Sequence, residues 1–272
     1  YNAGMRGLKT TMYEGGIRVP FLMRWPRMLK AGGKIDRLAA HIDVLPTLAD
    51  ACGLRAPAGV KWDGVNLMPL LRGRAAGWPD RNIFLQWHRG DEPEPFRNAA
   101  VLSQRYKLVD GRELYDLEAD PGEQHDIAAS NGERVAAMRK AYQDWLRDVS
   151  STRGYAPPRI YLGTPHENPV TLTRQDWRGP LASWKPDGLG YWEVDVREAG
   201  DYRIAFRFPP AKSPGAAEFR LAGVDAKVNL DAGALKCQWL LRLNAGPGRL
   251  EATLRFGGES VGVHYVDVQK LN

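Results

Sequence analysis

The chain has 272 residues, 43% of them hydrophobic and 26% charged, a balance typical of a soluble globular protein with one large or two ordinary domains. No run approaches the roughly 20 apolar residues of a membrane-spanning helix, and two cysteines provide no disulfide framework. The formal charge of +6 is concentrated in residues 1–40, where eight lysines and arginines face two acidic residues. No nucleic-acid motif accompanies this charge, so we expect no nucleic-acid partner; the field favours a sulfated or phosphorylated ligand instead.

The first motif is a glycine-rich loop that carries a lysine. Two glycines precede Lys9, a tight Glu14-Gly15-Gly16 turn follows, and the apolar run Val19–Trp25 predicts a buried strand. A cation in such a loop can hold a tetrahedral anion at the edge of an α/β sheet. Lys9 is therefore the candidate anion ligand, while Glu14 and Arg18 are expected to anchor the turn.

A helix is predicted over residues 43–52, with the sequence DVLPTLADAC. Asp43 lies near its N-cap, Pro46 falls in its first turn, and Gly53 ends it. We interpret this helix and the later segment DGVNLMPLLRG as packing elements of an α/β region that covers residues 1–78.

Residues 79–150 predict a small antiparallel sheet with one helix across it. Strands are expected over residues 82–87, 99–104, 106–109 and 113–117, and Asp110-Gly111 is the hairpin turn between the last two. Apolar residues at helical spacing predict a helix over residues 132–149. They are Val135, Met138, Tyr142, Trp145, Leu146 and Val149.

The loop after the first of these strands holds candidate substrate-binding residues. His88 and Arg89 follow the strand, and Arg97 lies further along the same proline-rich loop. A titratable histidine with arginines at a strand end suits a wall that selects a substrate; a half-buried structural His88 is the alternative. Four acidic residues of a later loop are interpreted as a surface group rather than a calcium site. They are Asp116, Glu118, Asp120 and Glu123.

Residues 151–170 are rich in Pro, Gly and Ser and predict a linker. Beyond it, strands are expected over residues 191–197, 202–208, 218–221, 235–243, 250–256 and 261–268. Short strands without a helical period predict an all-β sandwich over residues 171–272. Trp192 and Trp239 are expected to fill its core, whereas Trp177 and Trp184 are candidates for stacking on sugars.

Several of these strings closely resemble the formylglycine-dependent sulfatases of the alkaline phosphatase-like superfamily. They are RGLK, YEGGIRVP and WP near the start, then IDVLPTLADACG, and finally YKLVDGRELYDLEADPGEQHDIA, which extends the match to about residue 150. The resemblance implies the C-terminal part of the catalytic α/β domain for residues 1–78 and a small α+β subdomain for residues 79–150. It also implies that Lys9 contacts the sulfate group. The sandwich is only weakly similar to accessory modules appended to some bacterial sulfatases.

The resemblance further implies attack on sulfur by a hydrated formylglycine, with a calcium ion balancing charge. Formylglycine is made in a Cys/Ser-x-Pro-x-Arg motif, but Cys52 and Cys237 are followed by Gly-Leu and Gln-Trp. We therefore expect the formylglycine and the calcium ligands upstream of this chain, and we expect the isolated chain to be inactive. Because family members are commonly exported, a periplasmic or secreted location is implied.

The predicted function is hydrolysis of the sulfate ester of an aryl or carbohydrate substrate, with this chain joined to an N-terminal half. A phosphodiesterase or phosphonate hydrolase of the same superfamily stays open, since one lysine cannot distinguish tetrahedral anions. A module that only holds a sulfated glycan is the third alternative.

Overall fold

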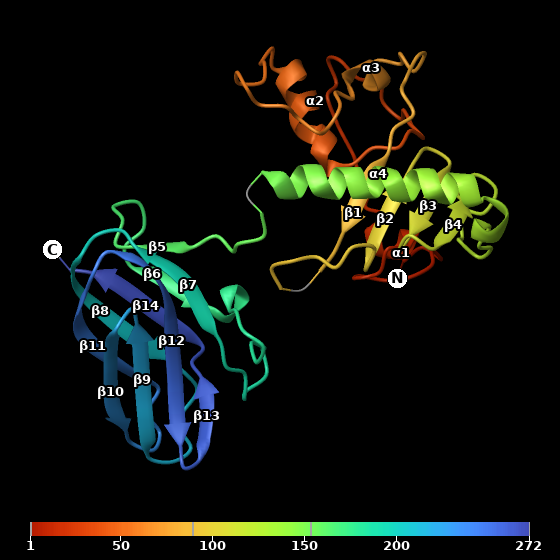
Figure 1. Cartoon of the computed structure of the whole chain (residues 1–272). Coiled ribbons are helices and arrows are strands. Elements are labelled where there is room, and N and C mark those ends of the chain that lie inside the picture. The colour runs from red at the N-terminus through yellow and green to blue at the C-terminus, as the bar shows by residue number, and fades with distance from the viewer. Residues whose placement is uncertain (1, 89, 153, 272) are drawn as a thin grey trace. The chain divides into compact units, whose positions relative to one another are not determined.

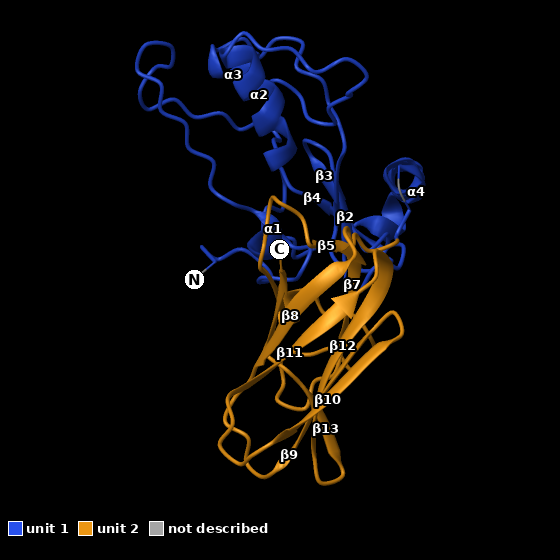
Figure 2. Ribbon diagram, turned by 90° about the vertical axis from the view of Figure 1, so that its left-hand side faces the viewer, with its two compact units in different colours: residues 1–155 blue, residues 156–272 orange. Residues whose placement is uncertain are grey.

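The computed structural model describes residues 2–88, 90–152 and 154–271. These residues form two compact units, unit 1 up to Tyr155 and unit 2 from Ala156 onward, shown in different colours in Figure 2. Unit 1 contains both regions that were predicted separately from the sequence, residues 1–78 and 79–150. Each unit has its own hydrophobic core.

Unit 1 is built on a four-stranded antiparallel sheet of order β1-β2-β3-β4. The strands are β1 (Ile83–Gln86), β2 (Ala99–Leu102), β3 (Tyr106–Val109) and β4 (Glu113–Asp116). Residues 110–112 join β3 to β4; Asp110 and Gly111 both have positive φ, and the Arg112 N–H donates to the Val109 carbonyl over 2.9 Å, which closes a tight hairpin turn. The hairpin predicted at Asp110-Gly111 is therefore confirmed.

Side-chain alternation gives this sheet two apolar faces. On one face, Leu108 packs in a cluster with Met138 of helix α4 (Gly132–Ser151), which lies across the sheet in Figure 1. On the other face, Val109 belongs to a cluster with Met12 from the start of the chain. The sheet is thus covered by α4 on one side and by the N-terminal segment on the other.

The described residues that precede β1 contain only short helical elements. These are α1 (Glu14–Ile17), the 3-10 helix η1 (His41–Asp43), α2 (Val44–Ala51) and α3 (Met68–Leu71). The strand predicted over Val19–Trp25 is wrong, because these residues have no strand structure and Leu22 is 92% exposed. A strand needs a neighbour for its N–H and C=O groups, and no described strand pairs with this segment. The α/β arrangement predicted for residues 1–78 is consequently absent from the described residues.

Asp43 occupies the N-cap position of α2, as predicted, but its side chain has another role. The fully buried carboxylate accepts hydrogen bonds from the Arg81 guanidinium and from the backbone N–H groups of Ala40 and Val65. Burial acts to raise the pKa of Asp43, but Arg81 and the two N–H groups outweigh it and the pKa is lowered. Asp43 therefore ties the start of α2 to the segment before β1.

Replacing Asp43 by Asn is expected to lower the free energy of unfolding by about 1.5–3 kcal/mol at neutral pH, because hydrogen bonds to a charged group are lost. Since the native pKa lies below the ordinary value of 3.8, the contribution is present above that value and is lost as the pH falls through the native pKa. Urea unfolding at neutral and acidic pH measures both effects, with the exposed Asp50→Asn as control. An effect of Asp43→Asn that does not diminish at acidic pH would contradict this role.

Unit 2 is a β-sandwich of two sheets around one core. One sheet has the order β10-β9-β12-β7-β5, with β13 also paired to β12, and the other has the order β11-β8-β14-β6. The strands are β5 (Ile160–Leu162), β6 (Val170–Thr173), β7 (Tyr191–Val196), β8 (Gly200–Arg207), β9 (Gly215–Leu221), β10 (Val224–Leu230), β11 (Lys236–Leu243), β12 (Gly246–Phe256), β13 (Glu259–Gly262) and β14 (Tyr265–Lys270). Their inward residues, among them the fully buried Trp192 and Phe206, fill the space between the sheets.

Four details of unit 2 differ from the sequence predictions, the first being strand β6 (Val170–Thr173), which no predicted strand covered. The linker predicted over residues 151–170 contains the last residue of α4 and strand β5, which pairs in parallel with β7 and buries Leu162 completely. The single strand expected over residues 261–268 is divided between β13 and β14, which belong to different sheets. Strand β10 was not predicted, because it lies at a sheet edge and buries only its last residue fully.

Candidate functional site

Lys9 lies in a loop whose backbone is fixed by its own hydrogen bonds. The Thr11 hydroxyl donates to the Leu8 carbonyl over 2.8 Å and accepts from the Leu8 N–H over 3.1 Å. The Thr11 N–H donates to the same carbonyl over 3.0 Å, so Lys9 is enclosed in a closed turn. Its side chain is exposed and forms no hydrogen bond or ion pair with the residues that the structure describes.

The glycines of the Glu14-Gly15-Gly16 turn are required by close packing of the backbone. A Cβ atom on Gly16 would lie 2.2 Å from the Thr11 carbonyl oxygen, and one on Gly15 would lie 2.5 Å from the Gly7 carbonyl oxygen. The Gly15 N–H also donates to the Arg6 carbonyl over 2.7 Å. The turn is therefore packed directly against the loop that carries Lys9, and the two cannot move independently.

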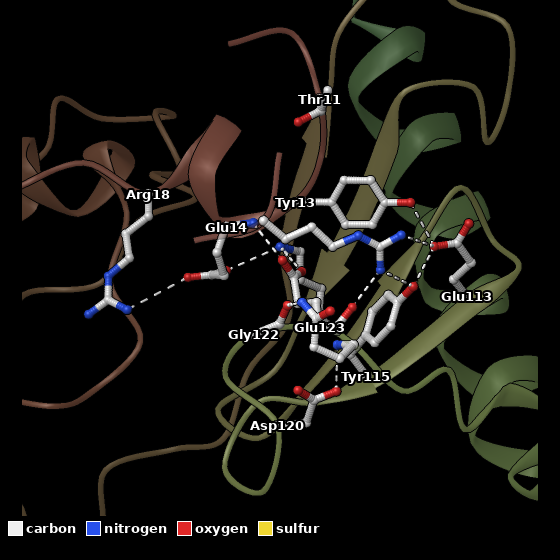
Figure 3. Close-up of polar contacts among 12 residues, drawn as sticks. Thr11, Tyr13, Glu14, Arg18, Glu113, Tyr115, Asp120, Gly122 and Glu123 are labelled. Atoms are coloured by element: carbon white, nitrogen blue, oxygen red, sulfur yellow. Dashed lines mark hydrogen bonds and ion pairs between the residues drawn. The ribbon is translucent and has the colours of Figure 1, made fainter. Parts of the chain in front are cut away.

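A buried ion cluster joins this turn to the sheet; we call Glu14, Lys107 and Glu123 the Glu-Lys-Glu cluster. The Lys107 ammonium of β3 is fully buried, 3.1 Å from Glu14 Oε1 and 2.6 Å from Glu123 Oε1. Glu123 Oε2 accepts a hydrogen bond of 2.8 Å from the Glu14 backbone N–H. Figure 3 shows Glu14 between Glu123 and Arg18, whose guanidinium lies 3.9 Å from Glu14 Oε2. The expectation that Glu14 and Arg18 anchor the turn is thus confirmed for Glu14, through a partner that was not predicted.

A second polar group fixes Arg6 and Tyr13, which precede the Glu14-Gly15-Gly16 turn, to β4 (Figure 3). The hydroxyls of Tyr13 and Tyr115 both donate to Glu113 Oε2, over 2.7 and 2.5 Å. The Arg6 guanidinium donates to the Tyr115 hydroxyl over 2.8 Å and lies 3.9 Å above the Tyr13 ring. Burial, and next the hydrogen bond to Glu113, raise the pKa of both tyrosines, so they remain protonated donors.

The other predicted site residues are not joined to this loop by polar contacts. His88 follows β1 and is exposed. Arg97 is exposed and forms an ion pair of 2.9 Å with Glu94 in its own loop. Arg89 lies outside the described residues. Among the described residues no hydrogen bond or ion pair links His88 or Arg97 to Lys9, and a substrate-binding role for these residues stays a prediction.

Lys107 was not predicted as a site residue, and Glu123 was predicted to belong to an acidic surface group. Both side chains are fully buried. A signal for Lys107 was present: it lies two residues before Val109 in β3, so both face the apolar side of the sheet that the N-terminal segment covers. A lysine in such a position needs a carboxylate partner. The identity of the partner was not readable, because Glu14 lies 93 residues away in the sequence.

No metal centre is formed within the described part of the chain. No group of three or more His, Cys, Asp or Glu side chains there could hold an ion. In the predicted acidic group, Asp116 is paired with Arg105, which holds its pKa below the ordinary value, and Glu123 is paired with Lys107. The calcium ion implied by the resemblance therefore does not fit these acidic residues, because two of their carboxylates are already paired with cations of the chain.

The aromatic residues of unit 2 differ from the prediction in which of them fill the core and which are exposed. Trp177, a predicted sugar-stacking residue, is buried against Trp192, so that prediction is wrong. Trp192 and Trp239 pack in the core as expected. Trp184 is 69% exposed, and the buried Arg174 braces its loop by donating to the Lys185 carbonyl over 2.7 Å.

Comparison with known proteins places this arrangement in the sulfatases. Residues 8–151, more than half of the chain, match the family described as N-sulphoglucosamine sulphohydrolase, C-terminal. The chain belongs to this family, and the predicted likeness to the C-terminal part of a sulfatase is confirmed. Its homologues are sulfuric ester hydrolases by name.

The chain is similar to sulfatases from several organisms. It is 45% identical to human steryl-sulfatase over 74 residues, which cover 27% of this chain and 13% of the relative. It is 30% identical to a Δ4,5-hexuronate-2-O-sulfatase of Bacteroides thetaiotaomicron over 176 residues, covering 58% and 36%. The solved structure of Ps i-CgsB is 26% identical with a TM-score of 0.48, covering 56% of this chain and 34% of that one. The chain thus spans between about an eighth and a third of the length of these proteins. Within the described residues, no helix has the length and hydropathy of a membrane span.

Proposed function

We propose that this chain is the C-terminal part of a sulfatase that hydrolyses sulfate esters of aryl or carbohydrate substrates, with Lys9 as a ligand of the sulfate group. The observation that carries the proposal is the state of Lys9. It is an exposed ammonium group without a partner among the described residues, on a hydrogen-bonded loop inside the segment that matches the family. What separates Lys9 from other exposed lysines of the chain is its position in the glycine-rich loop packed against the Glu14-Gly15-Gly16 turn, within the residues that match the family.

The chemistry follows from the charge. Cleavage of the S–O bond of a sulfate ester develops negative charge on the leaving oxygen, and a cation beside the sulfate group stabilises that charge more than it stabilises the ground state. Because the hydrogen bonds of Leu8 and Thr11 already order the backbone of this loop, only the Lys9 side chain has to rearrange when the ester binds. The nucleophile must come from elsewhere, since neither cysteine lies in a Cys/Ser-x-Pro-x-Arg sequence.

The relatives support the ester class rather than one substrate. Their names specify a steryl sulfate, a hexuronate 2-O-sulfate and an N-acetylglucosamine 6-O-sulfate. Their common group is a sulfate ester on a ring, which is the group that one fixed ammonium can recognise.

The test compares the 272-residue chain with an assembled sulfatase, that is, this chain preceded by an N-terminal region of the kind its longer relatives possess. We expect the assembled sulfatase to hydrolyse 4-nitrophenyl sulfate and the chain alone to show no turnover. Turnover by the chain alone would contradict the proposal. Preferred hydrolysis of bis(4-nitrophenyl) phosphate or of a phosphonate ester would favour the alternative enzymes of the same superfamily.

The exposed Trp184 supports a second, separable function, glycan binding by unit 2. The backbone of its loop is braced at Lys185 by Arg174, and an exposed indole is a suitable stacking surface for a sugar ring. We expect the 272-residue chain to bind a sulfated oligosaccharide and Trp184→Ala to weaken binding about tenfold, as measured by isothermal titration calorimetry. The control is Tyr161→Ala, which removes another exposed aromatic side chain of unit 2. Equal affinity of the Trp184→Ala variant and the unchanged chain would exclude this site.

A further inference from the structure

The Glu-Lys-Glu cluster connects two segments that the family match contains but that lie far apart in the sequence. Glu14 belongs to the turn beside the Lys9 loop, whereas Lys107 and Glu123 belong to the sheet and to the loop after it. Lys107 contacts both carboxylates, and Glu123 binds the Glu14 backbone as well as the Lys107 ammonium. The turn is therefore held by its side chain and by its main chain at once.

Such a cluster stabilises a fold only weakly, because burying ions has a large desolvation cost. Two carboxylates and one ammonium are removed from water, and replacing buried ions by apolar side chains of similar volume is often neutral or stabilising. What the ions add is a fixed geometry, because the Lys107 ammonium donates a hydrogen bond to Glu14 Oε1 and lies 2.6 Å from Glu123 Oε1 in an ion pair. Arg18 extends the series of alternating charges to the surface, at 3.9 Å from Glu14.

The fixed geometry is passed on to Lys9 by packing. Gly15 and Gly16 touch the backbone of residues 7–11 so closely that no Cβ atom fits between them. A displacement of Glu14 consequently shifts the turn that encloses Lys9. A displacement of about 1 Å at a catalytic group can lower a rate by about 100-fold.

We propose that Lys107 is a positioning residue of the sulfatase, which acts through Glu14 to hold the Lys9 ammonium at the place where the sulfate ester binds. The proposal rests on the function proposed above. It assigns a role in the reaction to a side chain that is fully buried and touches no substrate.

The test cuts the link at Glu14 in the assembled sulfatase. Glu14→Ala removes the side-chain contact between Lys107 and the turn, keeps the backbone N–H of residue 14 as a donor to Glu123, and leaves Lys107 and Glu123 as a neutral buried pair, so folding is expected to persist. We expect kcat for 4-nitrophenyl sulfate to fall about 10- to 100-fold in this variant. Glu14→Gln, which keeps an acceptor for Lys107, is expected to recover most of the activity. The exposed Glu118→Ala is the matched control and should leave kcat unchanged.

A double variant distinguishes positioning from general stability. If Glu14 and Lys107 act through Lys9, then Glu14→Ala added to Lys9→Ala lowers kcat no further. Multiplicative losses, or an unchanged kcat in Glu14→Ala, would overturn the proposal. If instead Lys9→Ala alone has no effect on kcat, the role of Lys9 in the proposed function fails, and the positioning role fails with it.

A second variant keeps the test decisive if Glu14→Ala does not fold. Lys107→Met combined with Glu123→Gln removes one buried charge of each sign and breaks the same connection. We expect this double variant to lower kcat by the same 10- to 100-fold, and we expect no further loss of kcat when it is combined with Lys9→Ala. A folded double variant with unchanged kcat would overturn the proposal.

Discussion

Replacing Lys9 by Ala in the assembled sulfatase is expected to lower kcat by about 10²- to 10³-fold, the loss typical of removing one preorganised group that stabilises developing charge. The physical reason is that the Lys9 ammonium has no partner among the described residues and is free to contact the sulfate oxygens. Steady-state kinetics with 4-nitrophenyl sulfate measure the effect, and Lys9→Arg should recover part of the rate because the charge returns.

The control for this prediction is Lys34→Ala, another exposed lysine of the basic N-terminal segment. It should leave kcat within about twofold, because an exposed charge outside the glycine-rich loop acts only through a field that salt screens. An equal loss in both variants would indicate a general field effect, and no loss in Lys9→Ala would remove the lysine from the reaction.

Replacing Lys107 by Met is expected to lower the free energy of unfolding by about 3–5 kcal/mol, the cost of breaking a buried ion pair by removing one partner. The variant leaves the Glu14 and Glu123 carboxylates close together, with Glu123 fully buried. Urea unfolding of the 272-residue chain measures the change. Lys140→Met removes a lysine of α4 whose side chain is 76% exposed and should cost less than about 1 kcal/mol. A similar small change for Lys107→Met would contradict the buried cluster.

Local patterns predicted the parts of unit 1 whose form depends on their own sequence. Val135, Met138 and Tyr142 repeat at helical spacing, and the helix is present. Asp110-Gly111 can adopt positive φ, and the hairpin turn is present. In unit 2 the alternating residues from Tyr191 onward became strands for the same reason.

The errors concern interactions between distant segments. Val19–Trp25 has the composition of a buried strand, but composition does not supply the neighbouring strand that pairing requires. Ile160–Leu162 was assigned to a linker because it is short and lies between proline and glycine; its pairing with β7 is what makes it a strand.

The candidate site shows the same division. The glycine-rich sequence around Lys9 indicated an anion ligand, and the structure leaves Lys9 exposed and unpaired among the described residues. The cluster behind it joins Glu14, Lys107 and Glu123 across two sequence-distant motifs, so no local pattern could reveal it. Only the packing of the N-terminal segment on the sheet brings these charges together.

A crystal structure of the assembled sulfatase soaked with inorganic sulfate tests the central claim most directly. We expect the Lys9 Nζ atom at about 3 Å from a sulfate oxygen, the distance of a charge-assisted hydrogen bond. A well-ordered sulfate in the catalytic site with the Lys9 ammonium more than about 6 Å away, beyond any direct contact, would contradict the account.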